Sequence, residues 1–159
     1  MNQPLVPDDF AVPEAYDTDF FRFELLGPRH NEADHAAWTS SIPHIRATPG
    51  FGGHWPPSEG VTLAENLADL RSHEDRSGRR VDFAYSVLDP TTGDVIGCVY
   101  FKPVSTVEDE VAALSWVRAD RAELDTRLTE VVGAWLAAAW PFASVRYRRG
   151  REPIVLRKD

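Results

Sequence analysis

Cysteine and long apolar runs are scarce in this sequence. Among its 159 residues there is one cysteine, Cys98, so no disulfide can form within the chain and nothing indicates an oxidising compartment. The longest apolar stretch, residues 131–145, is too short to span a bilayer and is interrupted by Pro141. Residues 1–19 lack the basic and apolar segments of a signal peptide. We therefore expect a cytoplasmic protein that does not enter membranes.

Basic side chains are also few, and the net charge is −8. Residues 1–144 carry −12 and residues 145–159 carry +4. An acidic body argues against nucleic-acid binding, because attraction to phosphates supplies most of that affinity. The basic cluster comprises Arg146, Arg148, Arg149 and Arg151. We expect it to contact the chain's own acidic side chains, while an acidic partner or a nucleotide phosphate stays an alternative.

The five histidines show no metal-binding spacing, and no second cysteine accompanies Cys98. We therefore expect no metal site. What the chain does contain is 43% hydrophobic residues, with five Trp and eight Phe, which is enough for one globular core. Residues 1–19 hold three prolines and five acidic residues, and we interpret them as an acidic, Pro-rich N-terminal arm. Residues 20–159 are expected to form a single domain.

The first half of that domain alternates between strand and helix signals. Residues 20–26 have the alternation of a strand and end at Gly27-Pro28. A short helix is predicted from Asn31 to about Ser40. Residues 48–60 are rich in Gly and Pro and predict a loop, and a capping box at Thr62 opens a second helix.

The second half gives the clearest pattern. Residues 81–88 and 95–102 predict a hairpin around a turn at residues 89–94, and residues 111–117 predict a further strand. Apolar spacing from Thr126 predicts a long helix that ends at Pro141. Residues 143–148 and 154–157 predict two last strands. This order predicts an α+β fold with a mixed, mostly antiparallel sheet and one parallel crossover through the long helix.

Three segments resemble the GNAT acetyltransferases, especially the branch that modifies ribosomal proteins or small amines. They are Asp82-Phe83-Ala84-Tyr85-Ser86-Val87, Gly93-Asp94-Val95-Ile96-Gly97-Cys98-Val99-Tyr100 and Leu114-Ser115-Trp116-Val117-Arg118-Ala119. The long helix follows them, and the resemblance covers roughly residues 20–148. It implies a GNAT-like fold and acetyl-CoA as co-substrate, with a small-molecule or protein amine as acceptor.

The resemblance also assigns site residues. It implies that backbone groups of Trp116, Val117 and Arg118 hold the pantetheine arm of acetyl-CoA. It further implies that Arg121, Thr126 and Arg127 line the pyrophosphate position. Glu110 is the candidate general base that accepts the amine proton, with a solvated acidic loop as the alternative. Trp55, Tyr85 and Tyr100 are candidates for the acceptor pocket, with a core role as the alternative for the two tyrosines.

Two departures from the family pattern keep a second function open. The pyrophosphate loop has Leu124 and Thr126 where the family has small residues, and Asp125, the expected cap of the long helix, competes for the same N–H groups. The family's last helix has no counterpart after Arg148. We therefore expect either an N-acetyltransferase or a non-catalytic GNAT-fold module, a pseudoenzyme that binds a ligand or forms a homodimer after losing acetyl-CoA binding.

Overall fold

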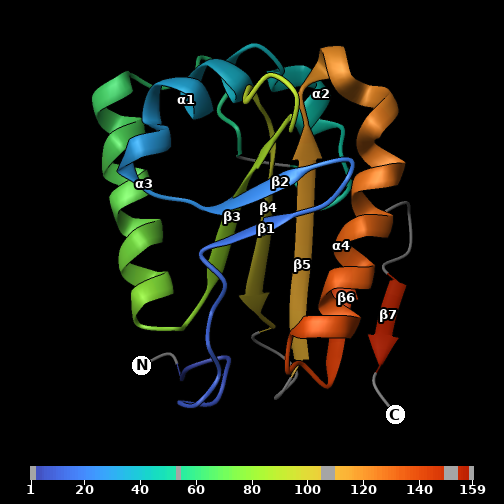
Figure 1. Cartoon of the computed structure of the whole chain (residues 1–159). Coiled ribbons are helices and arrows are strands. Elements are labelled where there is room, and N and C mark those ends of the chain that lie inside the picture. Colours follow the sequence, from blue (N-terminus) through green and yellow to red (C-terminus); the bar gives the residue numbers. More distant parts are fainter. Residues whose placement is uncertain (1–2, 53–54, 105–109, 149–153, 158–159) are drawn as a thin grey trace.

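A computed structural model describes residues 3–52, 55–104, 110–148 and 154–157. They form a seven-stranded sheet whose strands follow each other in sequence order, with every neighbouring pair antiparallel except β5 and β6 (Figure 1). The strands are β1 (Ala15–Asp17), β2 (Arg22–Leu25), β3 (Phe83–Leu88), β4 (Val95–Pro103), β5 (Glu110–Val117), β6 (Ser144–Tyr147) and β7 (Ile154–Arg157). This α+β, mostly antiparallel architecture is the one that the sequence predicts.

Helices cover both faces of this sheet, with α1 and α3 on one side and α4 on the other (Figure 1). The helices are α1 (Asn31–Thr39), α2 (Ile42–Arg46), α3 (Leu63–Gly78) and α4 (Asp125–Ala139), with the 3-10 turns η1 (Pro28–His30) and η2 (Ala119–Leu124). None of the described residues after β6 is helical, and no helix in the described ranges is long and apolar enough to cross a bilayer.

Local signals explain most of these boundaries. The capping box at the start of α3 is confirmed: the Glu65 N–H donates to Thr62 Oγ1 at 3.1 Å, and the Thr62 N–H donates to Glu65 Oε1 at 3.0 Å. In the β3–β4 turn, Asp89 Oδ1 accepts from the Thr91 N–H at 2.8 Å. Such side-chain to backbone bonds favour a tight turn over continued strand.

One prediction of local structure is wrong, and two elements were not predicted. Leu124, not Asp125, is the cap of α4, because η2 runs directly into the helix and makes Asp125 its first residue. The helix α2 and the strand β1 were not predicted. β1 lies inside the segment interpreted as an arm and pairs with β2, so Tyr16 is placed opposite Phe23.

The sheet separates two hydrophobic clusters. On the α4 face, Trp135 and Trp140 pack against strand residues such as Tyr85 and Phe101, and Val6 and Phe10 of the N-terminal segment join them. On the opposite face, α1, α2 and α3 cover β4 and β5 with a second cluster that includes Trp38, Ile45, Leu70, Tyr100 and Trp116. Burial of these aromatic side chains provides the main stabilisation of both layers.

Candidate functional site

Strand β5 continues beyond the point where its pairing with β6 ends. The two strands pair in parallel from Glu110 beside Ser144 to Ala113 beside Tyr147. The last bond between them runs from the Arg148 N–H to the Ala113 carbonyl, at 2.9 Å. Residues 114–117 of β5 continue to pair with β4 but have no pairing with β6. We call this divergence the fork.

On the side away from β4, the fork leaves part of the β5 backbone without a described strand partner. The Ala113 carbonyl points towards β6, whereas the Arg118 N–H bonds Ile96 O on β4 at 2.8 Å. Because alternate residues of a strand direct their backbone groups to opposite sides, those of Ser115 and Val117 point into the fork. Within the described ranges no other backbone group bonds them. The fork therefore contains the backbone groups of two buried residues that have no β6 partner.

Side chains bound the fork on both faces of the sheet. On the α4 face, Ser115 Oγ and Tyr147 Oη lie 2.7 Å apart and are buried. On the other face lies Gly50, with a φ of 97°; a Cβ there would come 2.7 Å from Leu114 Cδ2 and 3.1 Å from Arg148 Cβ. Only glycine fits this approach and this dihedral angle without strain.

A group of aromatic side chains lies beside the fork on the face that α2 covers; its members are Phe51, Trp55, Tyr100 and Trp116. Trp116 Nε1 donates to Tyr100 Oη at 3.0 Å, and burial raises the pKa of Tyr100. The rings of Trp55 and Trp116 are 6.5 Å apart, and Phe51 lies 5.8 Å from Trp55 and 5.9 Å from Tyr100. Two of the three predicted acceptor residues, Trp55 and Tyr100, are thus brought together.

Tyr85, the third predicted acceptor residue, lies on the opposite face of the sheet. Its hydroxyl donates to the Pro13 carbonyl at 2.7 Å, and its ring meets Trp135 edge-on at 5.0 Å. Its burial raises its pKa. The structure does not bring Tyr85 together with Trp55 and Tyr100.

Glu110, the candidate base, begins β5 at the paired end of the fork. Its Oε1 accepts from Arg146 Nε at 2.7 Å, and its side chain is 10% exposed. Alternation places Glu110 on the same face as Leu114 and Trp116. Five residues of strand, roughly 16 Å, separate it from Ser115. Arg146, part of the basic cluster, thus contacts an acidic residue of the chain itself; Arg149 and Arg151 lie outside the described residues.

The predicted pyrophosphate position is occupied by η2. Its first N–H, from Ala119, donates to Ser41 Oγ at 2.8 Å, and Ser41 is 2% exposed. The Arg121 N–H bonds Arg118 O at 2.9 Å, and the Asp125 N–H bonds Ala122 O. Three N–H groups of the segment that a phosphate would approach are therefore bonded within the chain.

The arginines predicted to meet phosphates have partners of their own. Arg118 binds both carboxylate oxygens of Asp120, at 2.8 and 2.9 Å, and this contact lowers the pKa of Asp120. Arg121 binds Asp89 Oδ2 at 3.0 Å, and likewise lowers the pKa of Asp89. Arg127 lies over the Phe20 ring at 4.3 Å. Thr126 is exposed in the first turn of α4.

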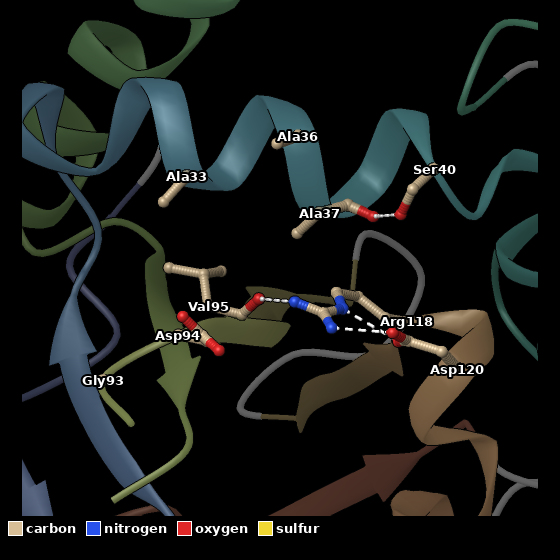
Figure 2. Close-up of a pocket in the computed structure, with 9 residues that line it drawn as sticks. All are labelled: Ala33, Ala36, Ala37, Ser40, Gly93, Asp94, Val95, Arg118 and Asp120. Carbon is tan, nitrogen blue, oxygen red and sulfur yellow. Dashed lines mark hydrogen bonds and ion pairs between the residues drawn. The ribbon is translucent and has the colours of Figure 1, made fainter. Parts of the chain in front are cut away.

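A shallow pocket of about 420 Å³ lies beside Arg118, between α1 and the β3–β4 turn (Figure 2). Small side chains form one wall: Ala33, Ala36 and Ala37 of α1, and Ser40 directly after the helix. Figure 2 shows the Arg118 guanidinium across the pocket from this wall, bonded to the Val95 carbonyl and to Asp120. No group of three or more metal-binding side chains occurs among the described residues.

Sequence reasoning missed four residues of this site: Ser41, Gly50, Ser115 and Tyr147. Ser115 was inside a segment that resembles the GNAT pattern, so the strand alternation could have shown that its backbone, and not that of Trp116, faces away from β4. Ser41 and Gly50 had no such signal, because they reach the site through contacts with residues more than 60 positions away.

Comparison with solved structures identifies the fold as that of the GNAT acetyltransferases. The ribosomal-protein-S5-alanine acetyltransferase from Vibrio fischeri matches with a TM-score of 0.65 and 11% identity, over 84% of this chain and 72% of that chain. A ribosomal L7/L12 α-N-protein acetyltransferase solved with coenzyme A matches with a TM-score of 0.66 and 9% identity, over 84% and 73% of the two chains.

A third match is the microcin C7 self-immunity acetyltransferase, solved with acetyl-CoA and AMP. Its TM-score is 0.66 at 9% identity, over 86% of this chain and 73% of that chain. No protein-family model matches this sequence, and no curated protein sequence does either. At such identities the likeness establishes the GNAT fold, and it leaves the substrate open.

Proposed function

We propose that this protein is an acyl-CoA-dependent N-acetyltransferase that acts on an amine. The fork between β5 and β6 carries the proposal, because Ser115 and Val117 have no β6 partner there and lie beside the Trp55–Tyr100–Trp116 aromatic group. The GNAT fold supports the same reaction, since two of the matched acetyltransferases were solved with coenzyme A or acetyl-CoA.

The two halves of acetyl-CoA fit this chain differently. The pantetheine arm contains amides, and Ser115 and Val117, which have no β6 partner, carry the backbone donors and acceptors that such amides bind. The pyrophosphate needs free N–H groups and free cations. The Ala119 N–H is bonded to Ser41, and Arg118 and Arg121 are bonded to carboxylates. The arm therefore fits the fork, and the pyrophosphate does not fit η2.

The residues of the chain have separate tasks in this proposal. Ser115 and Val117 hold the arm, and the bound thioester supplies the acyl group. Trp55 and Tyr100 bound the space where the amine approaches. Glu110 accepts a proton from the attacking amine through intervening water, since about 16 Å of strand separates it from Ser115. The new bond joins the amine nitrogen to the acyl carbon, the carbon–sulfur bond of the thioester breaks, and the sulfur leaves as a thiolate that then takes a proton from water.

The experiment that tests this function is an acyl-transfer assay with acetyl-CoA and a panel of small amines and peptide N-termini, followed by thiol release. We expect Glu110→Gln to lower kcat by about 10²–10⁴ if Glu110 is the base. Glu130→Gln is the matched control, because Glu130 is an exposed carboxylate on α4. Equal rates for both variants would remove Glu110 from the mechanism, and absence of transfer to every amine would reject the enzyme.

The bonding of η2 favours a second candidate, a GNAT-fold module without catalysis. The segment that would bind the pyrophosphate is closed by Ser41, Asp89 and Asp120. Such a module would bind another ligand or pair with a second copy of the chain. Light scattering on the purified protein would detect the dimer, and a melting temperature unmoved by any thioester would favour this candidate over the enzyme.

A further inference from the structure

We infer that this chain selects its acyl donor by the pantetheine arm alone and does not recognise the nucleotide half of coenzyme A. The inference rests on the proposed function, because it assumes that the fork takes the arm. It goes beyond that function by naming the donor class as pantetheine thioesters, whatever they carry beyond the arm.

The first observation is the backbone of η2. A pyrophosphate is held by N–H groups that have no other acceptor. The Ala119 N–H has an acceptor, Ser41 Oγ, that is itself 2% exposed and held at the start of α2. The Arg121 and Asp125 N–H groups have acceptors within η2. Binding a phosphate here would break these bonds first.

The second observation is that the guanidinium groups of Arg118 and Arg121 are already bonded to carboxylates of this chain. The Arg118 guanidinium gives two N–H groups to Asp120 and a third to the Val95 carbonyl. The Arg121 guanidinium is bonded to Asp89, whose other oxygen holds the β3–β4 turn. A bidentate contact with a carboxylate uses the same pair of donors that would hold a phosphate.

The third observation is steric and electrostatic. No glycine occurs between Arg118 and Val132, so every residue of the segment has a Cβ. Asp120 is exposed, and Asp94 faces the neighbouring pocket beside it (Figure 2). These carboxylates repel a phosphate. None of these three observations concerns the fork, where the buried Ser115 and Val117 have no β6 partner.

The experiment is a calorimetric titration of the intact protein with a nested series of ligands: S-acetylpantetheine, its 4′-phosphate and acetyl-CoA. We expect dissociation constants within about threefold of one another, whereas a working phosphate cradle would tighten acetyl-CoA by about tenfold or more. Adenosine 3′,5′-bisphosphate, which is the nucleotide half alone, should not compete with S-acetylpantetheine.

A gain-of-binding variant makes the test stricter. Asp89→Asn with Asp120→Ala releases both arginines, while the amide oxygen introduced at position 89 can still accept the turn N–H groups. We expect this double variant to bind acetyl-CoA at least about threefold more tightly and S-acetylpantetheine as before. The control is Asp75→Asn with Glu130→Gln, which changes the net charge by the same amount at exposed sites outside η2 and the fork. It should leave both affinities unchanged.

The outcomes separate the inference from the proposed function. Acetyl-CoA binding about tenfold tighter than S-acetylpantetheine, or competition by the bisphosphate, overturns the inference and leaves the enzyme intact. A double variant that binds acetyl-CoA no better than its control also overturns it. Failure of every thioester to bind overturns both the inference and the acyltransferase.

Discussion

At the scale of single residues, Ser41 connects two segments that are 78 positions apart. Its hydroxyl accepts the first N–H of η2, from Ala119, in a part-buried bond between the buried Ser41 and the exposed Ala119. Loss of such a bond removes its net contribution to the free energy of unfolding. The same bond removes the Ala119 N–H from any ligand, so Ser41 affects both the stability and the binding properties of this end of β5.

We expect Ser41→Ala to lower the free energy of unfolding by about 0.5–1.5 kcal/mol, because the hydrogen bond from the Ala119 N–H is lost. Urea unfolding at neutral pH measures the change. Ser58→Ala is the control, since Ser58 is exposed and its hydroxyl bonds only the neighbouring Glu59; it should change stability by less than about 0.5 kcal/mol. Equal effects of the two substitutions would contradict the assigned role of Ser41.

Gly50 closes one face of the fork, and its substitution tests that packing. Gly50→Ala adds a methyl group 2.7 Å from Leu114 Cδ2 at a φ of 97°, so we expect a loss of about 1–3 kcal/mol. Gly52→Ala is the matched control, because a Cβ there meets nothing within 4 Å. Thermal unfolding compares the two, and a Gly50 variant as stable as its control would show that the loop does not pack into the fork.

At the scale of elements, the N-terminal segment is part of the folded body. β1 extends the sheet at its edge, and the Tyr16 ring stacks on Trp135 at 4.6 Å with an interplanar angle of 2°. Val6 is 4% exposed, and the Pro13 carbonyl accepts from the Tyr85 hydroxyl. The segment covers the aromatic layer between the sheet and α4, although its composition resembles that of a flexible arm.

Deleting residues 1–17 should therefore destabilise the protein by at least about 3 kcal/mol, because it uncovers Trp135 and Tyr85 and removes several buried side chains. Chemical denaturation followed by tryptophan fluorescence measures the loss. An exposed layer should also raise the binding of a hydrophobic dye. A deletion variant as stable as the full chain would show that these residues do act as an independent arm.

The elements also show where sequence reasoning succeeds. The hairpin β3–β4 and the helix α4 were predicted because alternation and helical spacing are local patterns. β1 has only three residues, and α2 contains Pro43 and five residues, so neither gives a periodic signal. The cap of α4 was placed wrongly because Asp125 has the right residue type, while the preceding turn η2 already supplies the acceptors.

The fork itself could not be predicted from the sequence. Both β5 and β6 were predicted as strands, and the parallel crossover between them is confirmed. Where their pairing stops depends on Tyr147, Gly50 and Leu114, which meet only in the folded chain. The acceptor pair Trp55 and Tyr100 was predicted on residue type alone, and Tyr85 failed to join it because strand alternation puts residue 85 on the other face.

At the scale of the whole molecule, the charge disfavours polyphosphates. Residues 1–144 carry a charge of −12, and this charge repels phosphate groups. The internal pairing of Arg118 and Arg121 is consistent with weak polyphosphate binding.

The most direct test of this account is a titration of ¹⁵N-labelled protein with acetyl-CoA, followed through the backbone amide signals. If the fork holds the pantetheine arm, the Ser115 and Val117 amides should shift most, and the Ala119 amide should keep its position because Ser41 still accepts its proton. Unmoved Ser115 and Val117 signals, with or without shifts elsewhere, would contradict the fork as the donor site.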